Sequence, residues 1–197
     1  MAETQKQLFA DPSALGLFGF GLTTVLLNVH NLGLVGLANT MAIAYGFFYG
    51  GTAQVIAGII DFKRGNSFGG TAFTSYGLFW LGLALAVTFS WMGLITLTPI
   101  DLAWTMLLWG IFTTVLFAAS FRTNKALSFV FGSLATLFYL LTLSNFILAV
   151  DPTMTLPLTI TGIEGIVCGL SAMYTAAAIV INNMYGREIL PLGPYKK

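Results

Sequence analysis

The sequence predicts an all-α integral membrane protein, and three observations lead to this fold class. Of 197 residues, 57% are hydrophobic and 8% are charged, with a mean hydropathy of +0.87, whereas soluble domains carry about 25% charged residues. Six apolar stretches each approach the length of a membrane-spanning helix, and the basic residues lie between alternate stretches. Because the connections are short, we expect a single membrane domain over residues 1–197.

A helix needs roughly 20 apolar residues to cross a hydrocarbon core about 30 Å thick. The stretches that reach or approach this length predict transmembrane helices at residues 14–29, 41–60, 70–92, 100–121, 126–150 and 158–184. The first is short, and its polar end at residues 28–31 is expected to leave the hydrocarbon or to line an aqueous path. We predict no signal peptide, because the N-terminus lacks a basic region and a small-residue cleavage site.

The basic residues delimit these helices and predict the orientation of the chain. The loops at residues 32–40, 93–99 and 151–157 contain no Lys or Arg. All eight basic residues lie before the first helix or after the second, fourth and sixth, at Lys6, Lys63, Arg64, Arg122, Lys125, Arg187, Lys196 and Lys197. Since cytoplasmic loops carry the excess of Lys and Arg, both termini are predicted to be cytoplasmic.

Glycine clusters inside three of the predicted helices, at residues 16–21, 46–58 and 162–169. In lipid, small residues let helix backbones approach closely, and dispersion contacts then hold the helices together. Tight packing is therefore the favoured interpretation of these clusters. The alternatives are a narrow pore and contact with a neighbouring subunit.

The residue content also excludes several classes of function. A net charge of +1 gives no long-range field that would attract nucleic acid. The single cysteine, Cys168, excludes an internal disulfide and a Cys-based zinc site, and one histidine cannot form a metal site alone. No paired carboxylates and no Ser/His/Asp set with plausible spacing occur. We therefore predict that the chain is not an enzyme, with no metal, no cofactor and no nucleic-acid partner.

Polar side chains within the apolar stretches are costly to bury, so each should face a partner or a water-filled path. Neutral amides and hydroxyls can replace part of the hydration shell of a small anion, while a fixed Lys or Arg would hold the anion too tightly for fast release. For each residue the alternative is an interhelical hydrogen bond, and a helical hydroxyl can bond its own backbone. The candidate path residues are Asn28, His30, Asn31, Gln54, Thr74 and Asn145.

Glu164 is the only acidic residue well inside an apolar stretch. It lies toward the outer end of the sixth helix, where its side chain could extend to water. A functional and a structural role are both open for it.

Several motifs along the whole chain are together typical of one family. Residues 11–17 read Asp-Pro-Ser-Ala-Leu-Gly-Leu, residues 48–54 read Phe-Tyr-Gly-Gly-Thr-Ala-Gln, and residues 63–77 form the most specific stretch, Lys-Arg-Gly-Asn-Ser-Phe-Gly-Gly-Thr-Ala-Phe-Thr-Ser-Tyr-Gly. Tyr185-Gly186-Arg187 and Leu190-Pro191 follow near the end. The chain resembles the acetate uptake transporter (AceTr) family, of the succinate–acetate permease type. Asp11, Ala14 and Ile179 depart from its pattern, where relatives carry Asn, Pro and Glu.

The resemblance implies six helices around a pore of the protomer's own, in a homo-oligomeric ring that is expected to be a hexamer. It implies a pore that narrows at an apolar constriction matching Phe20, Tyr76 and Leu134. It also implies that the signature forms the pore entrance, at Asp11, Pro12, Leu15 and Gly16. The expected function is transport of acetate, succinate and other short carboxylates, as an anion channel or by symport with a proton, across a bacterial or archaeal inner membrane.

Residue chemistry adds two expectations to this resemblance. The signature would expose backbone N–H groups at the start of a short first helix, where a partial charge of about +0.5 suits a carboxylate. The Tyr76 hydroxyl would be the donor nearest the constriction.

Two alternative functions stay open: passage of ammonia or another small solute, and a non-transporting membrane sensor or scaffold. The scarcity of intramembrane acids disfavours a cation path, and the short segment 187–197 offers little for docking.

Overall fold

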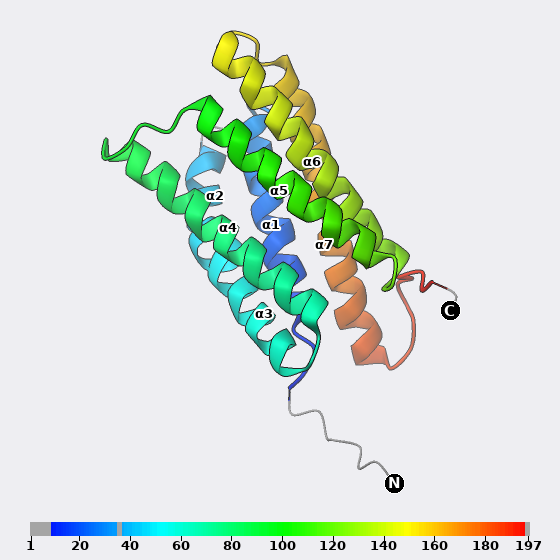
Figure 1. The fold of residues 1–197 in the computed structure, drawn as a ribbon. Coiled ribbons are helices and arrows are strands. Elements are labelled where there is room, and N and C mark those ends of the chain that lie inside the picture. Colours follow the sequence, from blue (N-terminus) through cyan, green and yellow to red (C-terminus); the bar gives the residue numbers. More distant parts are fainter. Residues whose placement is uncertain (1–8, 35–36, 196–197) are drawn as a thin grey trace.

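The computed structural model describes residues 9–34 and 37–195, and every regular element in that part of the chain is helical (Figure 1). The predicted positions of Lys6, Lys196 and Lys197 lie outside the described residues. The elements are α1 (Ser13–Asn31), α2 (Leu37–Phe47), the π-helical segment η1 (Phe48–Ala53), α3 (Gln54–Lys63), α4 (Ser67–Trp91), α5 (Pro99–Ser120), α6 (Lys125–Val150) and α7 (Leu156–Tyr185).

Six of the described helical segments are long and apolar enough to cross a membrane, which confirms the predicted number of spans. The second span runs over Thr40–Lys63 and combines α2, η1 and α3. The helices begin a few residues from the predicted bounds because polar residues cap them. Asn66 accepts a hydrogen bond from the Gly69 amide and starts α4, and Asn124 accepts one from the Leu127 amide and starts α6. Such caps satisfy backbone donors that the helix leaves free.

The discontinuity of the bundle lies in the second span, whereas the first helix is continuous over Ser13–Asn31. In η1 the chain makes a wider turn around Gly50 and Gly51, and the Thr52 hydroxyl donates to the Phe47 carbonyl at 2.8 Å. A π-helical turn contains more residues than an α-helical turn, so it changes the direction of the side chains that follow. Gln54, the next residue, is consequently almost fully buried.

The helices pack most closely as α1 with α7, α5 with α6, α3 with α4 and α6 with α7. In Figure 1, α1 runs through the middle of the bundle, and it also contacts α2, η1 and α3. The consecutive helices α4 and α5 contact each other far less than the paired helices do. The bundle is therefore well packed around α1 and less closely packed between α4 and the α5–α6 pair.

Glycine sets the contact between α1 and α7. A Cβ atom on Gly169 would lie 2.8 Å from the Gly21 carbonyl oxygen, and one on Gly21 would lie 2.7 Å from the Gly169 carbonyl oxygen. Ala172 and Ala176, further along α7, have no exposed surface. The two backbones thus approach more closely than any larger residue permits, which confirms the tight-packing interpretation for these glycines.

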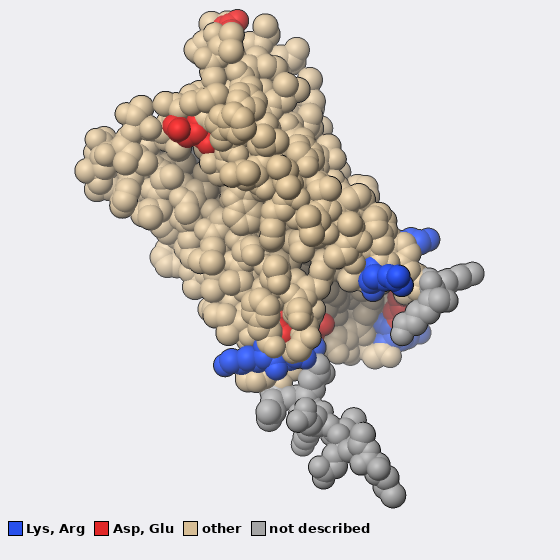
Figure 2. All heavy atoms as spheres, viewed as in Figure 1, with Lys and Arg blue, Asp and Glu red and all other residues tan. Residues whose placement is uncertain are grey.

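Charge is divided between the two ends of the bundle. The described basic residues lie at the lower end in Figure 2, in the α3–α4 turn, the α5–α6 turn and the segment after α7. The charged residues seen at the upper end are acidic, with Asp101 in the first turn of α5 and Asp151 directly after α6. We call the lower end the basic end. The placement of the basic residues at one end is the pattern that predicts a cytoplasmic location for that end.

Gly169→Ala should destabilise the protein by about 1–3 kcal/mol, because the added methyl group overpacks the α1–α7 contact. Thermal unfolding of the purified protein in detergent measures this as a lower Tm. The matched control is Gly82→Ala on α4, since a Cβ there would meet nothing within 4 Å. A Gly169→Ala protein that melts with wild type would contradict the packing described for α1 and α7.

Orientation can be tested with single cysteines at exposed positions of opposite ends, Asn183 and Thr96. In intact cells a membrane-impermeant thiol reagent should label Thr96→Cys and leave Asn183→Cys unlabelled until the cells are permeabilised. The native Cys168 is fully buried and serves as the background. Labelling of Asn183→Cys alone in intact cells would reverse the predicted orientation.

Candidate functional site

Two cavities lie inside the bundle, one above the other in the orientation of Figure 1. The upper cavity, of about 280 Å³, is lined from α1, α2, α4, α5, α6 and α7. The lower cavity, of about 320 Å³, opens toward the basic end and includes residues of the α3–α4 and α5–α6 turns. Both volumes are at the small end of the range for ligand sites, about 300–1,000 Å³. Each cavity therefore suits a small solute.

The two cavities share three lining residues, Phe20 on α1, Tyr76 on α4 and Leu134 on α6. These are the residues that the resemblance places at a constriction. Each is at most 5% exposed, and the Phe20 and Tyr76 rings lie 6.2 Å apart between centroids. The structure thus brings the three together at the point where, over residues 9–34 and 37–195, the linings of the two cavities meet.

The Tyr76 hydroxyl is bound within the protein. It lies 2.9 Å from the Thr113 hydroxyl on α5, and Thr113 donates its own hydrogen to the Trp109 carbonyl at 2.7 Å. A threonine hydroxyl has one hydrogen, so Tyr76 must be the donor in the pair with Thr113. This arrangement uses the Tyr76 hydrogen within the protein, so donation from this hydroxyl to a passing anion stays a prediction that the contact with Thr113 disfavours.

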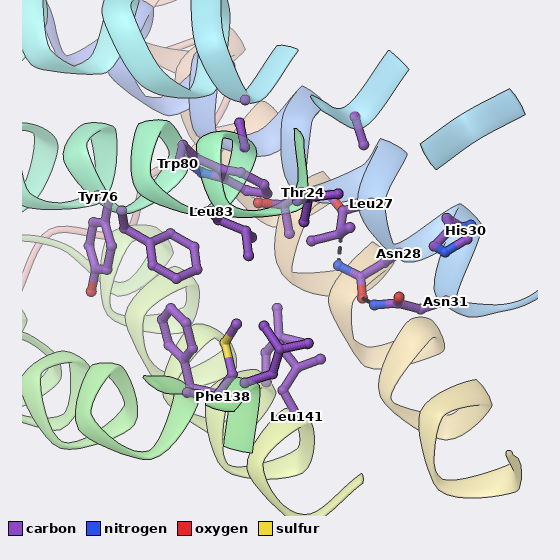
Figure 3. Close-up of a pocket in the computed structure, with 18 of the residues that line it drawn as sticks. Thr24, Leu27, Asn28, His30, Asn31, Tyr76, Trp80, Leu83, Phe138 and Leu141 are labelled. Atoms are coloured by element: carbon purple, nitrogen blue, oxygen red, sulfur yellow. Dashed lines mark hydrogen bonds between the residues drawn. The ribbon is translucent and has the colours of Figure 1, made fainter. Parts of the chain in front are cut away.

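Four of the predicted path residues line the upper cavity: Asn28, His30, Asn31 and Asn145. Figure 3 shows Tyr76 at one end of this cavity and His30 and Asn31 at the other. The Asn31 amide donates to the Asn28 side-chain oxygen at 3.1 Å, and the Asn28 amide donates to the Thr24 carbonyl at 2.9 Å. Each amide thus uses one of its two hydrogens within the protein and retains a second.

Gly165 on α7 makes room for this amide pair. A Cβ atom there would overlap the Asn28 side chain, which is 1% exposed. The Asn145 amide, on α6, donates to the Leu141 carbonyl at 2.8 Å and is fixed by its own helix. The polar end of the upper cavity is therefore built from neutral groups whose orientation the surrounding helices determine.

Gln54 and Thr74, the other two predicted path residues, are placed differently. Gln54 lines the lower cavity, is 1% exposed, and its side-chain oxygen has no hydrogen-bond partner among the described residues. Thr74 lines neither cavity; its hydroxyl packs against Gly58 on α3. The prediction for Thr74 is wrong because its position on α4 faces the contact with α3.

The signature residues are only partly at a cavity. Asp11 lines the lower cavity, whereas Pro12 precedes the first turn of α1 and accepts a hydrogen bond from the Gly16 amide at 3.1 Å. Leu15 is 39% exposed, and Gly16 packs against the Phe73 ring. Of the four residues, Asp11 lines the lower cavity and the other three do not, and an entrance role for the signature stays a prediction.

The start of α1 does not present a free anion site at its first amide. The Ser13 amide donates to the Asp11 carboxylate at 2.9 Å, so the chain's own acid occupies that donor. Burial opposes the charged form of Asp11, but the hydrogen bonds from Ser13 and the Arg64 guanidinium together hold its pKa below the usual value. Arg64 lies 3.1 Å from the Asp11 carboxylate and 3.3 Å from that of Asp61.

Glu164 lies outside both cavities, in an open groove between α5, α6 and α7. It is half-buried and accepts a hydrogen bond from the Ser133 hydroxyl at 2.6 Å. Ile179, where the resemblance implies an acid in relatives, lines the lower cavity. Glu164 is thus tied to α6 at a distance from Ile179.

Two polar residues that line the upper cavity, Thr24 and Trp80, were not among the predicted path residues. Each has a buried polar atom, the Thr24 hydroxyl and the Trp80 indole nitrogen, without a hydrogen-bond partner among the described residues. Buried polar groups are normally paired, so both are exceptions. The sequence signal that could have identified them was the same as for Asn28, a polar group within an apolar stretch.

A helical membrane bundle whose two cavities meet at one narrow apolar point has the architecture of a membrane channel or carrier. The chain belongs to the GPR1/FUN34/yaaH family, whose model matches residues 1–189. This membership confirms the family that the sequence motifs indicated.

Named relatives span most of the chain. The succinate-acetate/proton symporter SatP of Escherichia coli K12 is 43% identical over 185 residues, covering 93% of this chain and 95% of the relative. The solved structure described as the bacterial acetate channel SatP is 42% identical, covers 94% of this chain and 99% of that chain, and gives a TM-score of 0.88.

Fungal relatives are more distant. Acetate permease A of Emericella nidulans is 32% identical, over 97% of this chain and 68% of the relative. Ammonia transport outward protein 2 of Saccharomyces cerevisiae is 33% identical, over 90% of this chain and 64% of the relative.

Proposed function

We propose that this chain is a membrane channel or transporter for acetate and related small carboxylates. The proposed path runs through the bundle, from the upper cavity past Phe20, Tyr76 and Leu134 into the lower cavity. The observation that carries this proposal is that, among the described residues, these three alone line both cavities. The acetate- and succinate-transporting descriptions of the most similar relatives support the choice of substrate.

The lining chemistry suits an anion that binds weakly. Asn28 and Asn31 offer neutral amide hydrogens in the upper cavity, and Gln54 offers its amide in the lower cavity. Conduction requires binding that is favourable enough for entry and weak enough for release. Amides meet this requirement better than Lys or Arg, which would hold a carboxylate through a full charge.

The proposal includes two modes of transport, symport with a proton and passage through a channel. One relative is described as a proton symporter and another as a channel. Acetate uptake into proteoliposomes with and without a pH gradient separates them. Ammonia passage is the second candidate function, and the relative described as an ammonia transport protein favours it. Replacing acetate by ammonium in the same vesicles tests that candidate.

We further propose that the protomers form a homo-oligomer, a hexamer, in the inner membrane of a bacterium or archaeon, as the resemblance implies. Large apolar side chains on the outer faces of α5 and α6 are compatible with this arrangement, since they can contact lipid or a neighbouring copy. Examples are Leu108, Val115 and Leu143, each at least 55% exposed. We propose no enzymatic role.

Leu134→Ala should widen the point where the cavities meet. Flux of butyrate relative to acetate should rise by about tenfold, the lower range for a methylene-sized change in an apolar site. Reconstituted flux of both acids measures the ratio, and Leu143→Ala, on the outward face of the same helix, is the matched control. An unchanged ratio in folded Leu134→Ala protein would place the filter elsewhere.

Tyr76→Phe tests the finding that this hydroxyl donates to Thr113. Losing one buried hydrogen bond should cost about 0.5–1.5 kcal/mol of stability, while acetate flux should stay within about twofold of wild type because the ring still fills its place. Thermal unfolding and reconstituted flux measure the two effects. A loss of flux near tenfold in folded protein would mean that the hydroxyl turns to bind the anion.

A further inference from the structure

Among the residues that the structure describes, Asp11 is the only Asp, Glu, Lys or Arg that lines either of the two cavities. Its side chain is half-exposed at the basic end of the lower cavity. A path proposed for carboxylates therefore carries a carboxylate at its own wall. Because like charges repel, this residue must oppose the entry of anions from that end unless a cation compensates it.

The compensation by Arg64 is incomplete. A single Arg64 nitrogen, Nη1, lies 3.1 Å from Asp11 Oδ1 and 3.3 Å from Asp61 Oδ1. Asp61 has no exposed surface, and the Arg64 side chain is only 14% exposed. One guanidinium is thus shared between two carboxylates, so Arg64 is not the exclusive partner of Asp11. The nearby Lys63 ammonium lies over the Phe9 ring, 5.7 Å from its centroid, and lines neither cavity.

We propose that Asp11 discriminates between monovalent and divalent carboxylates at the basic end, admitting acetate more readily than the succinate dianion. This inference rests on the proposed function and adds a determinant of selectivity to it. Electrostatic free energy is proportional to the charge of the ligand, so a dianion meets twice the repulsion of a monoanion. The factor by which this repulsion slows entry of the dianion is therefore the square of the factor by which it slows entry of the monoanion.

Coulomb's law gives the scale of the effect. For a charge at about 10 Å and an effective dielectric constant of about 50, between a protein surface and bulk water, a monoanion is hindered about threefold and a dianion about ninefold. The effect must also decrease with salt, since the Debye length falls from about 10 Å at 0.1 M to about 3 Å at 1 M.

The environment of Asp11 keeps this charge in place. The Ser13 amide and Arg64 both bind its Oδ1 oxygen. These contacts favour the ionised carboxylate, so Asp11 stays charged at neutral pH. An asparagine at the same position retains the oxygen that accepts from Ser13 and removes only the charge, which makes Asp11→Asn a close structural substitute.

The test compares acetate and succinate flux through the full-length protein in proteoliposomes at neutral pH and low salt, with empty liposomes as the baseline. In Asp11→Asn, acetate flux entering from the basic end should rise about threefold and succinate flux about ninefold. The succinate-to-acetate ratio should therefore rise about threefold. Asp11→Glu should keep the wild-type ratio, and so should Asp151→Asn, which removes a charge outside both cavities.

A second measurement needs no variant. In the wild-type protein the succinate-to-acetate ratio should rise by about 1.5-fold when salt increases from about 0.1 M to about 1 M, because a charge at about 10 Å is already partly screened at the lower concentration. A ratio that does not change with salt or in Asp11→Asn, in a protein that conducts acetate, would overturn the inference while leaving the proposed function in place. A wild-type protein that conducts no acetate above empty liposomes would overturn the proposed function itself.

Discussion

Direct contact between helix backbones is the constraint on which the rest of the bundle depends. At Gly21 and Gly169, the backbone carbonyl of each helix, α1 or α7, lies close to the Cα atom of the other helix. A Cβ atom on Gly19 of α1 would lie 2.5 Å from the Tyr49 carbonyl oxygen of η1. These contacts hold α1 against both α7 and the second span. The backbones of the α5–α6 pair lie farther from α4, and this separation leaves the interior space that becomes the two cavities. In lipid, where apolar side chains gain little by leaving the solvent, such packing provides much of the cohesion.

The same packing explains how neutral polar groups can stand inside the bundle. Gly165 leaves the volume that the Asn28 amide fills, and the turn at η1 aims Gln54 inward. A buried amide is costly unless it is bonded, and Asn28 meets this cost with one bond to its own helix and one from Asn31. Its remaining hydrogen is available to a solute. The proposed path thus combines fixed neutral donors with a narrow apolar point, and none of the described Lys or Arg residues lines either cavity.

Sequence periodicity and charge predicted the six spans because each depends on local composition. They could not tell Asn28 from Thr74, since both are polar groups in apolar stretches and only the packing of neighbouring helices decides that one faces a cavity and the other Gly58. The π-helical turn was also beyond prediction, because the glycines that permit it equally permit an α-helix. Phe20, Tyr76 and Leu134 came from the family resemblance, and no local signal marks them as meeting in space. The hydrogen bond of the Tyr76 hydroxyl was also beyond prediction, because its partner Thr113 is 37 residues away in sequence.

The most direct measurement of whether solute passes between Phe20, Tyr76 and Leu134 is acetate flux through Leu134→Trp in proteoliposomes, with Leu143→Trp as the control on the outward face of the same helix. Tryptophan in place of Leu134 should fill the point where the cavities meet, so flux should fall to that of empty liposomes while the control conducts like wild type. Both proteins must elute from size-exclusion chromatography like wild type. Undiminished acetate flux through correctly assembled Leu134→Trp would show that the path runs outside this bundle interior.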